Sequence, residues 1–305
     1  MAQPATTHTT HVICENKKTY LFFVLSYFCK NKIKITDMKT YIVDAFTKEP
    51  FKGNPAGVCF PEQEISEEKM LKVALELGFS ETAFVQPTHK TGTYTIRYFS
   101  PKKEIPLCGH ATLASAKIIF KNSALNKIHF KTIENLNLTA RRRNDEIIME
   151  FPVYDTIDAT VPAAMLKALG LTEITNSAFS PQYKIILLEI NNADLLAGLK
   201  PDYNALLSSY NDIDGVLVTA PSNTKDYDYH YRYFWPWAGT NEDPVTGAVQ
   251  TFLAKYWSER LNKKIMRAYQ SSARTGYMNI ELQAEKVLLS SKAVIILEGN
   301  LVGFD

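Results

Sequence analysis

The chain has 305 residues, enough for one large or two medium-sized domains, and its 46% hydrophobic and 22% charged content is ordinary for a globular protein. The formal net charge of only +2 argues against a nucleic-acid-binding surface, and we interpret residues 141–143, three consecutive arginines, as a solvated face. The four cysteines include no C-x-x-C pair, so the sequence predicts no thiolate zinc site and favours a reducing, cytoplasmic compartment.

Residues 1–37 differ in composition from the rest of the chain. A polar stretch at residues 6–11 precedes an apolar run at residues 20–29, which is too short to span a bilayer. Lysines flank that run on both sides, and no small-residue cleavage site follows it. We therefore expect an N-terminal extension outside the folded core, a core that starts at Met38, and no membrane role.

The first half of the core is predicted to mix strands with two helices. A helix after Ser66 has first-turn acids and an apolar face, and Gly78 stops it. A second helix, over about residues 111–120, carries a single charge, Lys117, which predicts burial on nearly all sides. The predicted strands cover residues 38–46, 82–86, 94–99, 127–132, 136–142 and 146–151, and a further strand follows the loop of residues 50–55.

The second half is predicted to repeat this mixture without a linker. Helices are expected at residues 163–169, 193–196, 203–209 and 247–260, and strands at 184–190, 215–219, 227–234, 265–269, 276–282, 287–290 and 293–297. The predicted domains are residues 38–152 and 153–292, and the last strand, about residues 293–305, could return to the first half. We interpret each half as a mixed sheet around one buried helix, an α+β fold.

One sequence feature occurs twice. Residues 97–101 read Arg-Tyr-Phe-Ser-Pro, and residues 232–236 read Arg-Tyr-Phe-Trp-Pro. Each copy ends a predicted strand, and a loop then leads to a helix of small and apolar residues that opens at Gly109 or Gly247. This single long-period duplication predicts two similar halves that face each other.

The two predicted helix starts suggest a binding site. A helix N-terminus presents unpaired N–H groups and partial positive charge, so it can bind a carboxylate. Ionisable residues lie near these starts: Cys108, His110, Glu242 and Asp243, with Glu81 ahead of a strand. A buried carboxylate can shuttle protons near neutral pH. No G-x-x-x-x-G-K-[ST] or G-x-G-x-x-G loop is present, so no nucleotide cofactor is indicated.

Four motifs in order resemble one known family. They are Gly53-Asn54-Pro55-Ala56, Ser80-Glu81-Thr82-Ala83-Phe84, Cys108-Gly109-His110-Ala111-Thr112 and Asn241-Glu242-Asp243-Pro244-Val245-Thr246-Gly247. The set resembles the PhzF-like proteins, named for an isomerase of phenazine biosynthesis, over about residues 38–305. The resemblance implies the diaminopimelate epimerase fold, with two pseudo-symmetric halves, each a sheet curled around a central helix. It also implies cofactor-independent, metal-free isomerase activity on a small carboxylate-bearing substrate, and a homodimer.

The resemblance assigns roles to individual residues. Glu81 matches the general acid/base that moves a proton between substrate carbons, His110 matches a residue that holds the substrate, and Asp243 matches a substrate-contacting carboxylate. Substrate-binding roles are implied for Asn54, Gly109, Gly247 and Ala248. Arg274 resembles part of a late family motif whose role is open.

Two departures leave alternatives open. Ala248 stands where the phenazine enzyme has serine, which puts the phenazine precursor in doubt as substrate. Cys108 falls where related epimerases keep a catalytic thiol, but no second cysteine occurs in the second half. The main prediction is an isomerase using Glu81. The alternatives are an amino-acid racemase or epimerase using Cys108, and a non-catalytic binding protein of the same fold.

Overall fold

A computed structural model of the chain describes residues 37–303, and residues 1–36 and 304–305 lie outside the described part. Of the described residues, Lys39–Gly299 form one compact unit, and all elements that form the site lie in it. The predicted extension over residues 1–37 falls, apart from Asp37, outside the described residues. Among the described residues, no helix has both the length and the apolar character needed to cross a membrane.

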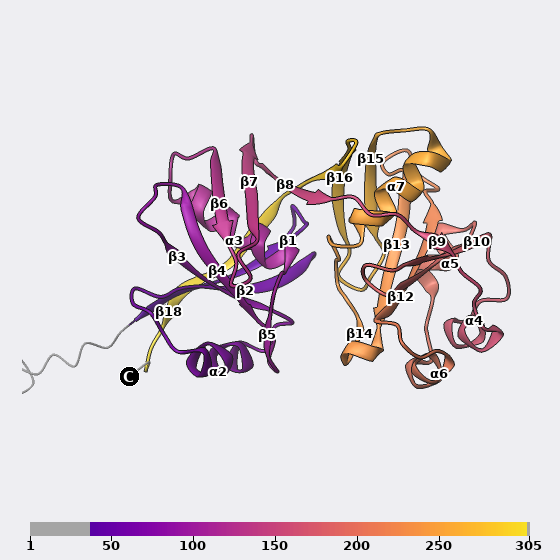
Figure 1. The fold of residues 1–305 in the computed structure, drawn as a ribbon, viewed down its shortest axis with the longest axis horizontal. Helices are drawn as coiled ribbons and strands as arrows, with labels where there is room; N and C mark the ends of the chain where they lie inside the picture. Colours follow the sequence, from indigo (N-terminus) through magenta and orange to yellow (C-terminus); the bar gives the residue numbers. More distant parts are fainter. Residues whose placement is uncertain (1–36, 304–305) are drawn as a thin grey trace, which may run out of the picture. The chain divides into compact units, whose positions relative to one another are not determined.

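The strands of residues 38–152 follow a fixed series of pairings (Figure 1). β1 is antiparallel to β2, and β2 is parallel to β3. β3 is antiparallel to β4, which is antiparallel to β5 and parallel to β6. β6, β7 and β8 are successive antiparallel neighbours. The bounds are β1 Met38–Ala45, β2 Asn54–Phe60, β3 Thr82–Pro87, β4 Thr93–Phe99, β5 Glu104–Ile105, β6 Lys127–Lys131, β7 Asn137–Arg143 and β8 Glu146–Pro152.

The same series of pairings recurs in the second half. β10 is antiparallel to β11, and β11 is parallel to β12. β12 is antiparallel to β13, which is antiparallel to β14 and parallel to β15. β15, β16 and β17 are again successive antiparallel neighbours. The bounds are β9 Ile157–Asp158, β10 Asn176–Ser180, β11 Ile185–Glu189, β12 Gly215–Pro221, β13 Tyr229–Trp235, β14 Thr240–Glu242, β15 Ile265–Gln270, β16 Gly276–Leu282, β17 Lys286–Ser291 and β18 Ala293–Leu301.

Hydrogen bonds join the two series of strands into one sheet. β8 pairs antiparallel with β17 over a register that runs from Pro152 opposite Lys286 to Ile147 opposite Ser291. β18 pairs with β1. The predicted α+β class with a mixed sheet is therefore confirmed, whereas the boundary between residues 152 and 153 stays a prediction.

Helix α3 (Gly109–Lys121) is the buried helix that the sequence predicted, and Figure 1 shows it enclosed by first-half strands. Ten of its 13 residues are buried. Its small side chains let strands approach closely, and its hydroxyls are satisfied locally, because Ser115 donates to the carbonyl of Ala111. The hydroxyl of Tyr98, on β4, lies 2.6 Å from that of Thr112, which donates to the carbonyl of Cys108. A buried aromatic residue of the repeated motif thus positions the start of α3.

The repeated Arg-Tyr-Phe motif makes the same contacts in both copies. The Arg97 guanidinium donates two hydrogen bonds to the Glu104 carboxylate, at 2.7 and 2.6 Å. Arg232 donates two to Glu242, at 2.7 and 2.8 Å. Each arginine also lies over the phenylalanine two residues on, at 5.2 Å in the first copy and 4.9 Å in the second. Each bidentate pair joins the strand that carries the motif to the short strand after it. This contact fixes the direction in which the following loop leaves the sheet.

The other helices lie at positions close to those predicted. In α2 (Glu67–Leu77), Ser66 accepts from the amide of Lys69, and Gly78 is left-handed with φ of 69°. The remaining helices are α4 Ala163–Leu169, α5 Ala193–Gly198, α6 Tyr203–Ser209, η1 Pro236–Ala238 and α7 Gln250–Leu261. Residues of α4, α5 and α6 pack with β11 and β12 in a second hydrophobic core, separate from the one that surrounds α3 and α7.

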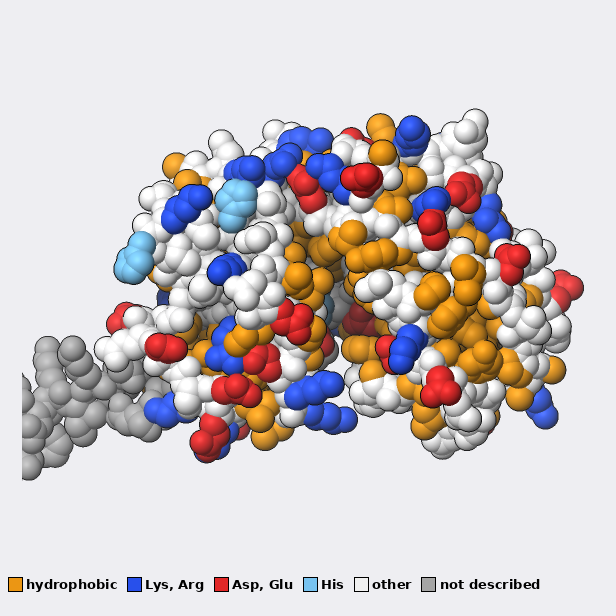
Figure 2. Space-filling view, in the orientation of Figure 1, with side chains coloured by type: hydrophobic (Ala, Val, Ile, Leu, Met, Phe, Trp, Pro, Cys, Tyr) orange, Lys and Arg blue, Asp and Glu red, His pale blue; other side chains and the backbone are white. Residues whose placement is uncertain are grey.

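Three features differ from the sequence prediction. The strands β5, β9 and β14 have two or three residues, too few for a visible alternation, and β10 was not predicted either. Helix α7 begins at Gln250 instead of Gly247, because residues 247–252 first form turns with hydrogen bonds that span three residues. On the face in Figure 2, acidic and basic side chains are interspersed, and hydrophobic side chains gather over second-half elements.

Candidate active site

Four segments far apart in the sequence bring polar side chains to one buried place. Asn54 opens β2, Glu81 immediately precedes β3, and His110 is the second residue of α3. Asp243 directly follows β14. All four residues are buried, with exposed fractions of 0% for Asn54, 8% for Glu81, 7% for His110 and 8% for Asp243. Polar groups this deeply buried must satisfy one another, which makes their contacts informative.

Asn54 links residues of the two halves. Its amide nitrogen donates to Asp243 Oδ1 at 2.8 Å and to the carbonyl oxygen of Val245 at 2.9 Å, and it lies 3.3 Å from His110 Nδ1. Its carbonyl oxygen is buried and has no hydrogen-bond partner among the described residues. Asn54 thus fixes the relative positions of His110 and Asp243.

His110 connects Cys108 to Glu81. Its Nε2 lies 3.2 Å from Glu81 Oε2, and its Nδ1 lies 3.4 Å from Cys108 Sγ. A carboxylate oxygen accepts hydrogen bonds, so we assign the tautomer in which Nε2–H donates to Glu81 and Nδ1 carries no hydrogen. Burial lowers the pKa of His110 to about 4, with nearby Asp243 acting in the opposite direction, so the imidazole is neutral near neutral pH.

The acidic groups of this cluster hold their protons more tightly than in water. Burial raises the pKa of Glu81, although hydrogen bonds with Ser80 and Cys108 act to lower it. Burial likewise raises the pKa of Asp243, partly offset by His110. The Cys108 thiol has a pKa well above its ordinary value, first because it is buried and second because Glu81 lies close. Cys108 is therefore a protonated thiol at neutral pH.

Asp243 is held by its own loop and by β15. The hydroxyl of Thr246 donates to Asp243 Oδ2, and the backbone amide of Asp243 donates to the carbonyl of Tyr233 at 3.1 Å. The side-chain amide of Gln270 donates to the carbonyl of Asp243, and its oxygen accepts from the amide of Thr246 at 2.7 Å. Nothing in the sequence pattern singled out Gln270, which is fully buried.

The two predicted glycines differ in their surroundings. A Cβ on Gly109 would make an ordinary contact, 3.8 Å from the ring of Phe151. A Cβ on Gly247 would lie 2.9 Å from the ring of Phe46, a fully buried residue with an unusual φ of 63°. Gly247 is thus required by packing. The backbone amides of Gly247 and Ala248 have no hydrogen-bond partner among the described residues and remain available to a ligand.

Arg274 holds the loop before Asn54 in place through hydrogen bonds. Its guanidinium donates to the carbonyl of Gly53 at 2.9 Å and to Asp44 Oδ1 at 2.7 Å. The amide of Gly53 in turn donates to the carbonyl of Thr275 at 2.8 Å. Arg274 therefore supports Asn54 through the backbone and does not contact the cluster itself.

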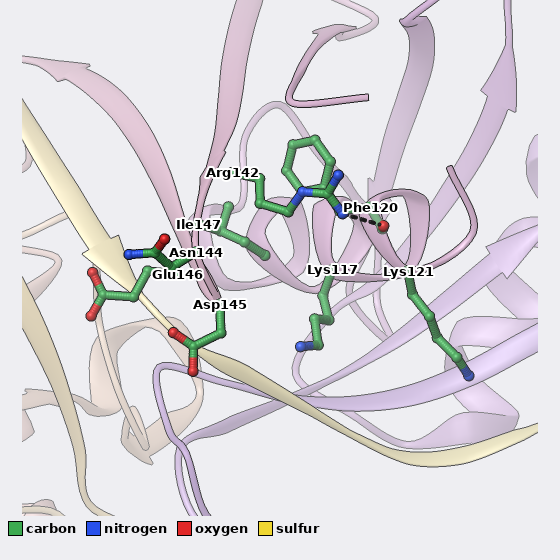
Figure 3. Close-up of a pocket in the computed structure, with 8 residues that line it drawn as sticks. All are labelled: Lys117, Phe120, Lys121, Arg142, Asn144, Asp145, Glu146 and Ile147. Atoms are coloured by element: carbon green, nitrogen blue, oxygen red, sulfur yellow. Dashed lines mark hydrogen bonds between the residues drawn. The ribbon is translucent and has the colours of Figure 1, made fainter. Parts of the chain in front are cut away.

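A separate cavity of about 310 Å³ lies at the other end of α3 (Figure 3). Three of its lining charges have partners: Arg142 donates to the carbonyl of Phe120 at 2.9 Å, Lys121 pairs with Glu298, and Asp145 pairs with Lys292. Lys121 lies eleven residues along α3 from His110, a rise of roughly 16 Å at 1.5 Å per residue. This cavity is distinct from the buried cluster.

The described residues that could jointly hold a metal ion are Glu81, Cys108 and His110, whose ligand atoms lie within 4.8 Å of one another.

The structure thus places Asn54 in contact with His110 and Asp243, and His110 in contact with Glu81, while the roles assigned to these residues stay predictions. Cys108 joins them through the imidazole, and Glu242 does not, because it is committed to Arg232. The residues that sequence reasoning missed are supports: Thr246 lay inside a quoted motif, whereas Gln270 and Phe46 gave no signal.

Comparison with known proteins gives consistent matches over the described core. The family model of phenazine biosynthesis-like proteins (PhzC-PhzF) matches residues 43–299. The chain is 38% identical over 285 residues to the phenazine biosynthesis-like domain-containing protein 1 of Mus musculus, covering 86% of this chain and 98% of that protein. It is 40% identical over 266 residues to an uncharacterised isomerase of Halalkalibacterium halodurans, covering 86% and 97%.

Solved structures share the fold. A PhzF-family protein of Enterococcus faecalis aligns with a TM-score of 0.81 and 32% identity, over 87% of this chain and 99% of that chain. A hydroxyproline epimerase from Agrobacterium vitis aligns with a TM-score of 0.54 and 12% identity, over 88% and 94%, which shows a shared fold alone. The epimerase-like fold inferred from the sequence motifs is confirmed by these matches.

Proposed function

Because the chain belongs to the phenazine biosynthesis-like (PhzC-PhzF) family, we propose that it is an isomerase that moves a proton between two carbons of a small carboxylate-bearing metabolite. The observation that carries this proposal is the contact of Glu81 with a neutral His110 inside a buried cluster that also holds Asp243. We also expect the enzyme to need no cofactor, to act as a cytoplasmic homodimer, and to bind neither nucleic acid nor membranes.

Glu81 is the proposed acid/base. Its carboxylate would take a proton from a carbon made acidic by a neighbouring carbonyl or carboxylate, and the electron pair of the C–H bond would delocalise into an enolate-like system. The protonated Glu81 would then return the proton to another carbon of the same system. Burial, which raises the pKa of Glu81, supports both halves of this cycle, because a base with a raised pKa holds the proton and still releases it near neutral pH.

His110 and Asp243 are proposed to orient the substrate. The neutral imidazole donates Nε2–H to Glu81, which holds that carboxylate in place without an added charge. Asn54 keeps His110 and Asp243 at fixed separation, so the three side chains form one pre-organised surface. Loss of Asn54 is therefore expected to impair the site without removing a reacting group.

The substrate class follows from the backbone groups near this surface. The N-terminus of α3 at Gly109 and the unpaired amides of Gly247 and Ala248 provide N–H donors without a cationic side chain. Such donors suit a carboxylate and stabilise negative charge that develops on it during proton transfer. Ala248 supplies no hydroxyl, so the substrate is held by backbone donors alone at this position.

The protonation state of Cys108 disfavours the racemase alternative. A racemase needs a second base on the opposite face of the substrate carbon, and burial together with the nearby Glu81 raises the pKa of the Cys108 thiol well above its ordinary value. A protonated thiol can give a proton to that face but is a poor base, so the reverse reaction, in which Cys108 would take the proton, is disfavoured. Replacement of Cys108 by alanine is accordingly expected to preserve proton transfer.

Deuterium incorporation from heavy water tests the proposal. The purified chain is incubated with a panel of small carboxylate metabolites in heavy water, and mass spectrometry follows the uptake of deuterium at carbon. We expect one or more metabolites to exchange with the intact chain, and Glu81→Gln to reduce that rate by at least about 100-fold, the lower end of the effect of a general acid/base.

The matched control is Glu76→Gln, which makes the same chemical change on an exposed position of α2. Unfolding curves of all variants show whether the fold is kept. Exchange by Glu81→Gln at the intact rate would overturn the assignment of Glu81, and equal loss in Cys108→Ala would favour the thiol-based racemase.

A further inference from the structure

The outer face of β6 and its neighbours gathers basic side chains from three segments. Along β6, the second and fourth residues are buried in the core, and Lys127, His129 and Lys131 alternate with them on the outer face. The turn between β3 and β4 adds Lys90, whose backbone carbonyl accepts from the amide of Thr93 at 3.0 Å, and Thr93 lies opposite His129. This face therefore holds four basic residues before β7 is counted.

Two like charges face each other directly across β6 and β7. Lys127 is paired in register with Arg141, and both residues are exposed. Opposite side chains in an antiparallel pair have Cβ atoms about 4.5–5.5 Å apart, and like charges there are destabilising. Glu150 lies 2.5 Å from Arg141 and relieves it in part, but Lys286 shares that carboxylate at 2.9 Å. The fold thus keeps a repulsive arrangement that a neutral or acidic residue at position 127 would remove.

The positive charge on this face is largely uncompensated. Lys90, Lys127 and Lys131 form no ion pair with any residue that the structure describes. Burial first, and then the charges of Lys127, Lys90 and Arg141, lower the pKa of His129. Figure 2 shows Lys and Arg side chains next to one another over β7 and β8. The imidazole of His129 therefore senses a positive potential that an anionic partner would offset.

The spacing of these side chains favours an extended acidic chain over a small anion. An exposed ion pair contributes little by itself, so several contacts must act together on an open sheet face. Lys127, His129 and Lys131 occupy every second position of a strand, about 6.6–6.8 Å apart. An extended peptide presents alternate side chains at the same repeat, so carboxylates on every second residue would meet them in turn. A formal net charge of only +2 disfavours nucleic acid as the partner.

We propose that the basic surface formed by Lys90, Lys127, His129, Lys131 and Arg141 binds an extended acidic segment of a partner protein. Carboxylates on alternate residues of that segment lie against Lys127 and Lys131 and relieve the repulsion between Lys127 and Arg141. None of these residues belongs to the buried cluster around Glu81, so the proposal is independent of the proposed isomerase activity.

Fluorescence anisotropy with a labelled peptide tests the basic surface without a substrate. The probe is a synthetic peptide of alternating glutamate and threonine, and the comparison peptide has the same composition with its glutamates in one block. We expect the purified full chain to bind the alternating peptide more tightly, and the affinity to fall as the salt concentration rises. Lys127→Met combined with Lys131→Met should weaken binding by at least about 5-fold, because each exposed ion pair accounts for up to about that factor.

The matched control is Lys200→Met combined with Lys264→Met, which removes the same charge from exposed positions of the second half. It should change the affinity by less than about 2-fold, since long-range effects of exposed charges are screened by salt. Urea unfolding curves verify that both double variants fold. Histidine NMR gives a second measurement, in which saturating peptide should raise the pKa of His129, because bound carboxylates offset the charges that lower it.

Absence of peptide binding at low ionic strength would overturn the proposal, as would equal affinity of the intact chain and of Lys127→Met with Lys131→Met. An unchanged pKa of His129 at saturating peptide would place the peptide elsewhere and reject this surface. Equal binding of the two peptides would reject the extended conformation of the partner. Tighter binding of a single-stranded oligonucleotide than of the alternating peptide would identify a nucleic acid as the partner and overturn the acidic segment.

Discussion

Replacing Arg274 by methionine removes the positive partner of a carboxylate that folding has buried. The side chain of Asp44 is 2% exposed, and Arg274 Nη2 lies 2.7 Å from its Oδ1. Breaking a buried ion pair by removing one partner costs about 3–5 kcal/mol. The side chain of Arg274 is 33% exposed, so solvent compensates part of the loss, and we expect the free energy of unfolding to fall by about 3 kcal/mol at neutral pH.

The pH dependence of that loss follows from the pKa of Asp44. Burial raises this pKa, while the Phe51 amide and Arg274 act to lower it, so Arg274→Met raises it further. A carboxyl group whose folded pKa lies above its unfolded value contributes stability below the unfolded pKa and loses it as the pH rises through the folded pKa. The penalty of Arg274→Met should therefore be largest at neutral pH and shrink as the pH falls and Asp44 takes up its proton.

Urea unfolding followed by circular dichroism measures this penalty at neutral and at mildly acidic pH. Arg143→Met, on an exposed arginine, is the matched control and should change the free energy of unfolding by less than about 0.5 kcal/mol. The double variant Arg274→Met with Asp44→Asn should lose less than the sum of the single losses, because it leaves no unpaired charge. A penalty below about 1 kcal/mol, or one of equal size at both pH values, would refute the reasoning.

Two matched pairs of variants test the packing around the two glycines and the ion pairs of the repeated motif. Gly247→Ala should destabilise the fold by about 1–3 kcal/mol in urea unfolding, because its Cβ would lie 2.9 Å from a buried ring, whereas Gly109→Ala, with its nearest contact at 3.8 Å, should cost much less. Equal losses of unfolding free energy in the two glycine variants would show that the ring of Phe46 moves away without cost. Arg232→Met should cost about 3–5 kcal/mol, more than Arg97→Met, because the Arg232 side chain is 8% exposed and that of Arg97 24%. Thermal and urea unfolding of both variants measure the difference, and the reverse order would contradict this account of the motif.

Local patterns in the sequence determined most of the elements. The charge-poor run at residues 111–120 predicted a helix buried on nearly all sides, and ten of the 13 residues of α3 are indeed buried. Ser66 and Gly78 marked the ends of α2, because capping chemistry depends on neighbours within a few residues. The duplicated Arg-Tyr-Phe motif predicted two copies of one arrangement, and each copy makes the same arginine–glutamate contacts.

Elements too short to show a period, and boundaries set by distant contacts, were beyond that reasoning. The strands β5, β9 and β14 exist only as partners of longer strands. The start of α7 shifts to Gln250, where Phe46, the residue that follows β1, packs against the preceding turn at Gly247. Such shifts arise from tertiary packing, which overrides local propensity.

The candidate site shows the same division. The motifs named Glu81, His110, Asp243 and Asn54, because each residue sits in a recognisable local context. Only the tertiary structure decided that Asn54 donates to Asp243 across 189 residues of sequence, and that the Cys108 thiol faces the imidazole. Hydrogen bonding and desolvation act over a few ångströms in space, so the pKa of Glu81 and the protonation of His110 depend on neighbours that the pairing of distant strands brings together.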